Sequence, residues 1–89
     1  MANKIHLVVE TAGGVAFERD VRYVNLPVEG GSVGVLAGHA AMLCALCEGT
    51  VRCSDDSGES FGVKTGHGAA QVENNTVTVL VSSAQTQDN

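Results

Sequence analysis

No stretch of this chain keeps apolar residues at a helical spacing over the roughly ten to twelve residues that a typical helix needs. Short runs rich in valine recur instead, and each run ends at glycines or acidic residues. Such runs are typical of β-strands bounded by turns. The chain is therefore predicted to be all-β, and its many short strands with glycine-rich connections favour a sandwich or a small barrel.

The first strand is expected where Ile5, Leu7 and Val9 alternate with polar residues. Residues 11–14 should turn it back, and further turns are expected at residues 54–58 and 74–75, where Asp, Ser, Gly and Asn gather. Val15 and Phe17 lie at one parity of the chain and Val24 and Leu26 at the other. A turn or bulge near residues 18–20 is the simplest account of this change.

At 89 residues the chain is long enough for a single domain with one modest core. We assign residues 1–84 to the domain and residues 85–89 to a polar, disordered tail, within a polar segment that begins at Ser82. With two phenylalanines, one tyrosine and no tryptophan, the core must be built from valine, leucine and alanine. The residues expected to be buried are Phe17, Leu36, Leu43, Val63 and Val79.

Charge excludes one large class of partner. Five basic residues stand against ten acidic ones, which gives a net charge of −5, and the lysines and arginines form no cluster. Binding to nucleic acid is therefore not expected. No apolar run approaches the roughly 20 residues that span a bilayer, and the N-terminus has no secretory pattern, so the expected compartment is the cytoplasm, without direct membrane insertion.

The chemically reactive residues form no recognisable catalytic or metal site. Cys44 and Cys47 are three residues apart, but on an extended strand such residues point to opposite faces, so neither a metal nor a dithiol is well served. Three cysteines also argue against a disulfide framework. The histidines are scattered, no nucleophile elbow is present, and no glycine pair is followed by the lysine of a phosphate loop. No catalytic residue, metal or cofactor is expected.

The most distinctive segment runs from Leu26 to Gly49 and holds the only proline and five of the eleven glycines. A Leu-Pro pair precedes an acidic, glycine-rich turn, a Gly-Val-Leu-Ala-Gly-His-Ala run follows, and a leucine-bearing run closes the segment. This order resembles the epsilon subunit of rotary ATP synthases. The positions that match the usual pattern of that family are Leu26, Pro27, Gly31, Gly34, Leu36, Gly38, His39, Ala40 and Leu43. Further likeness at residues 5–9, 68–72 and 77–80 extends the resemblance over nearly the whole chain.

The resemblance implies an antiparallel β-sandwich of about ten short strands that is not itself an enzyme. It would dock on the gamma subunit and on the proteolipid ring of an F-type ATP synthase and couple proton translocation to ATP synthesis or hydrolysis. Carried over by position, the gamma side would include Thr11, His39 and Met42, and the ring side would be the turn Glu29, Gly30, Gly31 and Ser32. The expected location is peripheral, at the cytoplasmic face of the bacterial inner membrane.

The sequence departs from that family in several places. Ser32 stands where a glutamate is common, so Glu29 is the only carboxylate of the turn. Ala37 and Ala41 replace two prolines beside Gly-His-Ala, which should make that corner less rigid. The sequence also stops where most members continue into a helical hairpin, so the inhibition and nucleotide binding of that hairpin are not assigned to this chain.

Two alternatives stay open from the sequence. For His39, a ring that faces a partner competes with a corner histidine that bonds its own backbone. For the whole chain, the alternative function is a free-standing β-sandwich that binds a small ligand or peptide.

Overall fold

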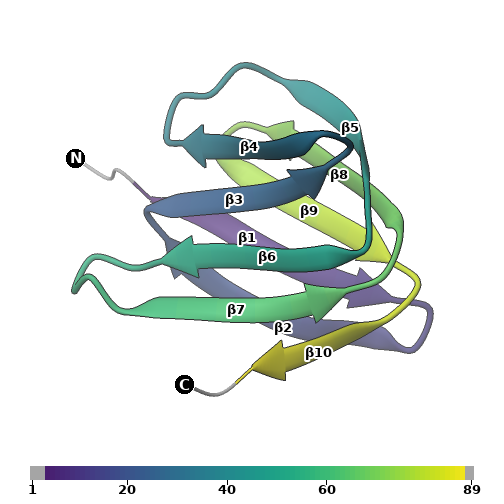
Figure 1. Cartoon of the computed structure of the whole chain (residues 1–89). Coiled ribbons are helices and arrows are strands. Elements are labelled where there is room, and N and C mark those ends of the chain that lie inside the picture. Colours follow the sequence, from purple (N-terminus) through teal and green to yellow (C-terminus); the bar gives the residue numbers. More distant parts are fainter. Residues whose placement is uncertain (1–3, 88–89) are drawn as a thin grey trace.

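The computed structural model describes residues 4–87, which form ten β-strands in two stacked sheets (Figure 1). In chain order the strands are β1 (Ile5–Thr11), β2 (Gly14–Val21), β3 (Tyr23–Val28), β4 (Gly31–Leu36), β5 (Met42–Leu46), β6 (Gly49–Ser54), β7 (Ser60–Thr65), β8 (Gly68–Glu73), β9 (Thr76–Val81) and β10 (Ala84–Gln87). The expectation of an all-β sandwich with about ten short strands is confirmed. Within the described residues no element is a helix, and so none has the helical length and apolarity needed to cross a membrane.

We call the two sheets A and B. Sheet A has the strand order β2-β1-β9-β8-β5, and sheet B has the order β10-β7-β6-β3-β4. Every neighbouring pair is antiparallel except β1 and β9, which are far apart in the sequence and run parallel. Three of the turns lie where the sequence predicts them, after β1, between β6 and β7, and at residues 74–75 between β8 and β9.

The core lies between the inner faces of the two sheets. In β1 the alternation is as expected, because Ile5, Leu7 and Val9 are fully buried while their neighbours are partly exposed. The buried apolar residues are Ile5, Leu7, Val9, Val21, Val24, Leu26, Val35, Leu46, Val51, Cys53, Val63, Ala70, Val72, Val77, Val79 and Val81. Valine thus dominates the core, and no buried side-chain nitrogen or oxygen in residues 4–87 lacks a hydrogen-bond partner.

Two of the predicted core residues are exposed, and the prediction was wrong for both. Leu43 is 76% exposed and Leu36 is 61% exposed. In β5 the residues on both sides of the strand are apolar, and Leu46 faces inward. Leu43, three residues before it, therefore lies on the outer face. In β4 it is Val35 that is buried, and Leu36 pairs with Tyr23 on the outer face of sheet B. The other three behave as expected or nearly so, since Val63 and Val79 are buried and Phe17 is half-buried against Phe61.

The change of parity also occurs elsewhere than expected. Strand β2 passes through residues 18–20 without a break. The pairing of β1 with β2 shifts between Val9 and Glu10, which leaves Ala16 as an extra residue in β2. The chain then leaves sheet A at Arg22 and enters sheet B at Tyr23. The change of sheet moves the inward parity from Phe17 and Val21 to Val24 and Leu26, whereas the bulge puts Val15 on the outer face although Phe17 faces the core.

The expected disordered tail is a strand over most of its length. Residues 84–87 form β10, which pairs with β7 from Ala84 opposite Thr65 to Gln87 opposite Gly62. Polar side chains did not prevent this pairing, because an edge strand needs few buried side chains and is held by its backbone hydrogen bonds. The last two residues of the predicted tail lie outside the described residues.

Candidate docking surface

The outer surface of sheet A carries a patch of exposed apolar side chains. Strand pairing sets Ala45 opposite Ala69, and Ala69 opposite Leu80. Leu80 in turn pairs with Glu10, whose other partner is Val15 on the edge strand β2. Leu43 lies on the same face, two residues before Ala45. We call this set the apolar face: Val15, Leu43, Ala45, Ala69 and Leu80.

The exposure of the apolar face is large for a soluble domain. Val15 and Leu80 are each 57% exposed, and Leu43 is 76% exposed. The outer face of an antiparallel sheet is usually polar, because it meets water. Contiguous exposed apolar patches on a protein surface commonly mark a site of contact with another macromolecule. The apolar face is therefore the best candidate for a docking surface on this chain.

The sequence does hold a signal for this face. Strand β5 is apolar at both parities, with Met42, Cys44 and Leu46 on one side and Leu43 and Ala45 on the other, and in β9 Leu80 follows two threonines on the outer side. A strand that is apolar on both sides is expected to be covered on both sides. The pattern of β5 does not select which of its two sides is buried, and the expectation that Leu43 is buried names the wrong side.

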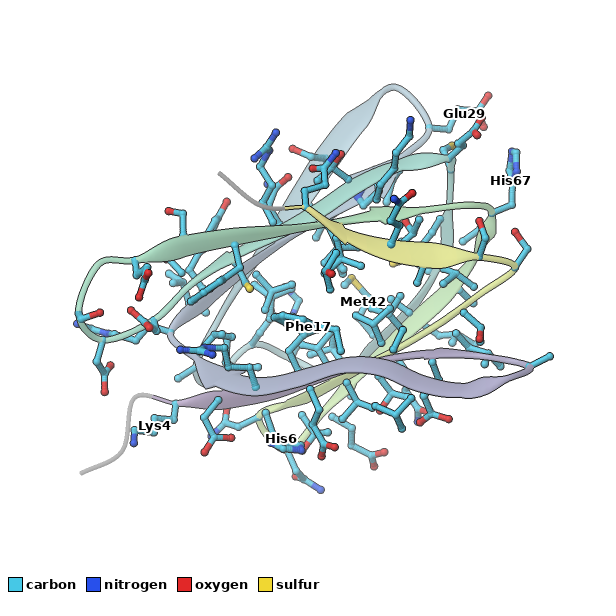
Figure 2. All side chains as sticks on the ribbon, turned by 90° about the horizontal axis from the view of Figure 1, so that it is seen from below. Lys4, His6, Phe17, Glu29, Met42 and His67 are labelled. Atoms are coloured by element: carbon cyan, nitrogen blue, oxygen red, sulfur yellow. The ribbon has the colours of Figure 1, made fainter. Side chains whose placement is uncertain are left out.

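The acidic turn between β3 and β4 projects from one end of the sandwich. Val28 pairs with Gly31, so Glu29 and Gly30 form the tip, and all of residues 29–32 are exposed. Gly30 has a φ of 83°, a left-handed conformation that glycine adopts without steric cost. Ser32 lies just past the tip, where its hydroxyl accepts a hydrogen bond of 3.1 Å from the side-chain amide of Asn25. Figure 2 shows Glu29 at the same end as His67, with Lys4 at the other end.

The Gly-His-Ala corner is held by its own chain. The backbone N–H of Gly38 donates to the side-chain oxygen of Asn75 at 2.7 Å, and Gly38 has a φ of 86°. The backbone N–H of His39 donates to the carbonyl oxygen of Leu36 at 3.1 Å. Nδ1 of the His39 ring lies 2.7 Å from the carbonyl oxygen of Ala40. In the tautomer that carries its proton on Nδ1, the ring donates a hydrogen bond to this oxygen. The backbone-bonded alternative for His39 is thus the arrangement in the isolated chain.

No metal or redox chemistry is indicated by the cysteines. All three are free, with Cys44 and Cys47 half-buried and Cys53 buried. Burial raises the pKa of the Cys53 thiol to about 11, so the thiolate, which is the reactive form, is scarce at neutral pH. Within residues 4–87, no group of three or more histidine, cysteine and acidic side chains could hold a metal ion.

A shallow hollow of about 470 Å³ lies where the β4–β5 and β6–β7 connections approach each other. Its lining combines the ring of Tyr23 and the exposed Leu36 with Arg22, Asp55 and Asp56. Arg22 already pairs with Asp56, with 3.4 Å between Nε and Oδ1. The charged groups of the hollow thus partly satisfy one another, which makes it a weaker candidate site than the apolar face.

Comparison with known proteins connects this fold to one family. The sequence profile described as "ATP synthase, Delta/Epsilon chain, beta-sandwich domain" matches residues 4–87. The chain belongs to the ATP synthase delta/epsilon family.

Curated relatives are ATP synthase epsilon chains. The chain is 37% identical to that of Campylobacter fetus over 82 residues, which is 92% of this chain and 64% of the relative. It is 40% identical to the chloroplastic epsilon chain of Cyanidioschyzon merolae over 75 residues, which is 84% of this chain and 56% of the relative. The sequence thus spans somewhat less than two thirds of the length of these epsilon chains.

Solved structures agree on the fold. A chain in the mitochondrial ATP synthase of Euglena gracilis, in a structure of "OSCP/F1/c-ring", superposes with a TM-score of 0.88 at 20% identity, over 97% of this chain and 55% of that chain. A chain from the "central stalk/cring" of the Tetrahymena thermophila mitochondrial ATP synthase gives a TM-score of 0.74 at 15% identity, over 92% and 66% of the two chains.

Within this delta/epsilon sandwich, the three residues expected on the gamma side do not form one patch. His39 is near the start of β1, because its neighbour Gly38 bonds to Asn75, and the carbonyl oxygen of Asn75 accepts from the backbone N–H of His6. Thr11 is at the other end of β1, five residues further on, or about 17 Å along an extended strand. Met42 packs inward against the core, as Figure 2 also shows.

Thr11 lies instead at the same end of the sandwich as the acidic turn. The backbone N–H of Cys47 bonds to the carbonyl oxygen of Pro27, which joins the end of β5 to the end of β3. The last residue of β5, Leu46, pairs with Gly68, and Gly68 pairs with Val81 beside the end of β1. The expected ring-side residues 29–32 are contiguous and exposed, whereas the expected gamma-side residues are divided between the two ends and the core.

Proposed function

We propose that this chain is a non-catalytic subunit of the central stalk of an F-type ATP synthase, where it docks on the gamma subunit and on the proteolipid ring. In that place it couples proton translocation to ATP synthesis or hydrolysis at the cytoplasmic face of a bacterial inner membrane. Membership of the delta/epsilon family supports this role. The structural observation that carries it is the apolar face, which leaves Val15, Leu43 and Leu80 exposed to water in the isolated chain.

The gamma subunit is the proposed occupant of the apolar face. A subunit that transmits torque needs a stable contact, and stable interfaces have a well-packed apolar centre with a polar rim. Ala69 and, beyond it, Ala45 lie to one side of Leu80, and their small side chains leave room for side chains of a partner to pack on the outer face of the sheet. Glu18 lies on the same outer surface of sheet A and would contribute to the rim, whereas Glu10 lies within the face, between Leu80 and Val15, and would need a polar partner on gamma.

His39 is a second proposed contact with gamma, at the border of this surface. The β4–β5 connection that holds His39 leads directly into β5, whose Leu43 belongs to the apolar face. Thr11 and Met42 are less suited to the gamma contact, because Thr11 is at the end of the sandwich near the acidic turn and Met42 is turned into the core.

The proteolipid ring is the proposed partner of the β3–β4 turn. Residues 29–32 form an exposed tip at one end of the sandwich, and Glu29 is its only charged residue. A single exposed carboxylate gives a weak and strongly screened attraction. Backbone and Ser32 hydrogen bonds to polar loops of the ring would therefore provide most of this contact.

The test is the recovery of coupling. The 89-residue chain should bind the cognate gamma subunit and restore ATP-dependent proton pumping to membranes from which epsilon has been removed. Because the docking surface is apolar, binding should depend only weakly on salt. Leu80→Glu should abolish binding and recovery, and Gln85→Glu, which adds the same charge on the exposed β10 of sheet B, should leave both intact.

Absence of binding by the wild-type chain would contradict the proposed function. The alternative, a free-standing module that binds a small ligand or peptide, would gain support if the wild-type chain failed to bind gamma while a ligand occupied the hollow lined by Tyr23 and Leu36. A His39→Asp variant that binds gamma as well as the wild type would remove His39 from the contact.

A further inference from the structure

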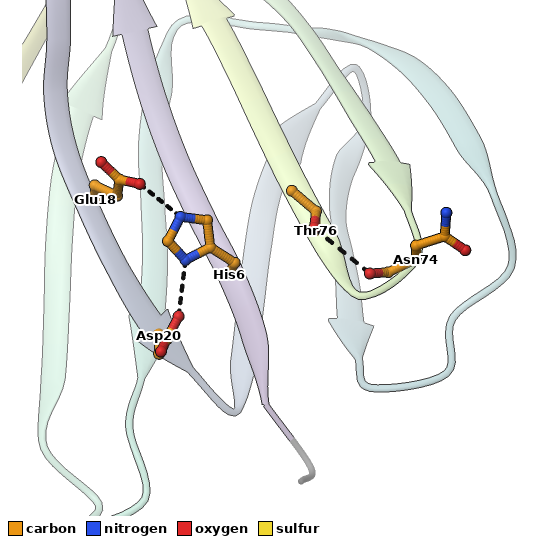
Figure 3. A network of polar contacts seen from close by, with 5 residues as sticks. All are labelled: His6, Glu18, Asp20, Asn74 and Thr76. Carbon is orange, nitrogen blue, oxygen red and sulfur yellow. Dashed lines mark hydrogen bonds and ion pairs between the residues drawn. The ribbon is translucent and has the colours of Figure 1, made fainter.

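An imidazole is held between two carboxylates on the outer face of sheet A (Figure 3). His6 lies on β1, with Nε2 2.6 Å from Oε2 of Glu18 and Nδ1 2.7 Å from Oδ1 of Asp20. Both acids belong to β2, and Asp20 pairs directly with His6 across the two strands. A neutral imidazole has one N–H and can donate to only one carboxylate, whereas the imidazolium donates to both. Donation to both carboxylates at once therefore needs the protonated ring.

Apart from the contacts with His6 and its ladder with β1, strand β2 is attached to sheet B by two side chains: Phe17 packs against Phe61, and Arg19 lies over the Phe61 ring with its Nη2 3.5 Å from Oδ2 of Asp55. Strand β2 is an edge strand of sheet A and pairs only with β1 within that sheet. Six of its eight residues are exposed, and only Val21 is fully buried. The bulge at Ala16 also interrupts the hydrogen-bonded ladder to β1. A strand with little buried surface and an interrupted ladder belongs to the part of a fold that opens most easily.

We propose that His6 is a proton-dependent clip that holds β2 more firmly on sheet A when its ring is protonated and lets the strand loosen when the proton leaves. On deprotonation one ring nitrogen presents a lone pair to a carboxylate, so one of the two hydrogen bonds is replaced by repulsion. Glu18 and Asp20, which lie two residues apart on the same face of β2, then also lose the positive charge between them.

The charges around the clip favour the protonated ring. Lys4 is the nearby cation and lies close enough to Asp20 to attract it, and Lys4 and Asp20 share a shallow hollow with Asp55 and Asp56 of the β6–β7 connection. On β9 the neighbour of His6 is the uncharged Thr76, and beyond it on β8 is Glu73.

The direction of the pH effect follows from these contacts. The hydrogen bonds to Asp20 and Glu18 raise the pKa of His6 above its usual value of 6.5. A raised pKa in the folded state means that the clip contributes in full below about pH 6.5 and is lost as the pH rises through the folded value. The hydrogen bond from His6 lowers the pKa of Asp20, so at the acid end the clip persists until the pH falls through that lowered value.

Loosening of β2 would also affect the apolar face, because Val15 lies on that strand. This consequence rests on the proposed function, whereas the clip itself does not. A chain whose edge strand loosens as the pH rises would dock less tightly on gamma under alkaline conditions.

The clip can be tested on the isolated 89-residue chain by NMR. The His6 ring should titrate at a higher pH in the wild type than in a Glu18→Gln/Asp20→Asn variant. Amide protection in β2, measured as a ratio to that in β9, should fall about two- to fivefold between about pH 6 and pH 9. The midpoint of this fall should coincide with the midpoint of the His6 titration. The ratio should show no such step in that variant or in His6→Gln.

Two results would overturn the clip: a His6 titration that is unchanged when both acids are neutralised, or a β2 protection ratio without a step in the wild type. Affinity for gamma, measured over the same pH interval, tests the regulatory consequence. Wild-type affinity that is equal at both ends of the interval would overturn that consequence. Absence of gamma binding at every pH would contradict the proposed function, and the exchange data would still decide for or against the clip.

Discussion

Two leucines show how differently the same side chain is used in this sandwich. Leu7 on β1 is fully buried between the sheets, whereas Leu43 on β5 is 76% exposed on the outer face of sheet A. Burial of a leucine side chain contributes about 1.5–3 kcal/mol, and its removal from a packed core adds the cost of a cavity. The two positions should therefore respond in opposite ways to the same truncation.

Leu7→Ala should lower the free energy of unfolding by about 2–5 kcal/mol, because it leaves a cavity in the core. Leu43→Ala should change it by no more than about 0.5 kcal/mol, because the removed atoms are already in water. Urea denaturation of the isolated chain measures both values. A loss of several kcal/mol for Leu43→Ala would place that side chain in the core after all.

At the scale of elements, the β8–β9 hairpin does more than reverse the chain. Asn74 and Asn75 have φ values of 52° and 58°, which is the backbone of a type I′ turn, and asparagine tolerates it well. The side-chain oxygen of Asn75 accepts from the N–H of Gly38, so the same turn also holds the β4–β5 connection.

Asn75→Gly should separate these two roles. Asn-Gly is a favoured type I′ pair, so the hairpin should remain, while the Gly38 amide loses its acceptor and should exchange with solvent faster. Asn74→Gly changes the neighbouring turn residue and keeps the acceptor, so Gly38 should stay protected. Amide exchange followed by NMR distinguishes the two variants, and equal protection of Gly38 in both would show that the Asn75 side chain does not anchor the connection.

The β6–β7 hairpin is closed by a carboxylate. Oδ1 of Asp55 accepts from the hydroxyl of Ser57 at 2.7 Å and from the backbone N–H groups of Ser57 and Glu59, each at 3.0 Å. These hydrogen bonds, that of the Ser57 hydroxyl above all, lower the pKa of Asp55 below its usual 3.8. A lowered pKa in the folded state contributes stability above the usual value, and this contribution is lost as the pH falls through the folded value.

The Tm of the wild-type chain should therefore fall more steeply below about pH 4 than that of Asp55→Asn, whose amide does not titrate. Asp56→Asn, a neutralisation at the next position in the same loop, should keep the steep acid dependence of the wild type. Thermal unfolding followed by circular dichroism over the acid range gives the three slopes. Parallel curves for the wild type and Asp55→Asn would rule out this carboxylate as the source.

How far the sequence predicts each element depends on its pattern. β1 could be predicted residue by residue, because only one of its parities is strongly apolar, and the turn at residues 74–75 could be placed because Asn-Asn favours a left-handed backbone. The orientation of β5 could not be predicted, because both of its parities are apolar. Only the packing of Leu46 in the core decides which side of the strand faces inward. The contact of His6 with Glu18 and Asp20 depends on the register of β1 with β2, which a bulge shifts.

At the scale of the whole molecule, the two outer surfaces of the sandwich differ in character. Sheet A presents the apolar face, with the clip of His6 beside it. On β6, β7 and β10, sheet B presents hydroxyl and amide groups together with Arg52 and Lys64. Among the described residues its large exposed apolar side chain is Leu36 on the edge strand β4, against three such side chains on sheet A. Such asymmetry is expected of a domain that is covered on one side and hydrated on the other. We therefore expect sheet A, and not sheet B, to face gamma.

Site-specific photo-cross-linking tests that expectation most directly. A photoreactive phenylalanine derivative is placed at position 80 in the apolar face, and in a second variant at position 52 on the exposed surface of sheet B. Each variant is mixed with the cognate gamma subunit and irradiated. We expect the derivative at position 80 to cross-link to gamma and the derivative at position 52 to remain unlinked. Cross-linking of gamma from position 52 and not from position 80 would contradict the account.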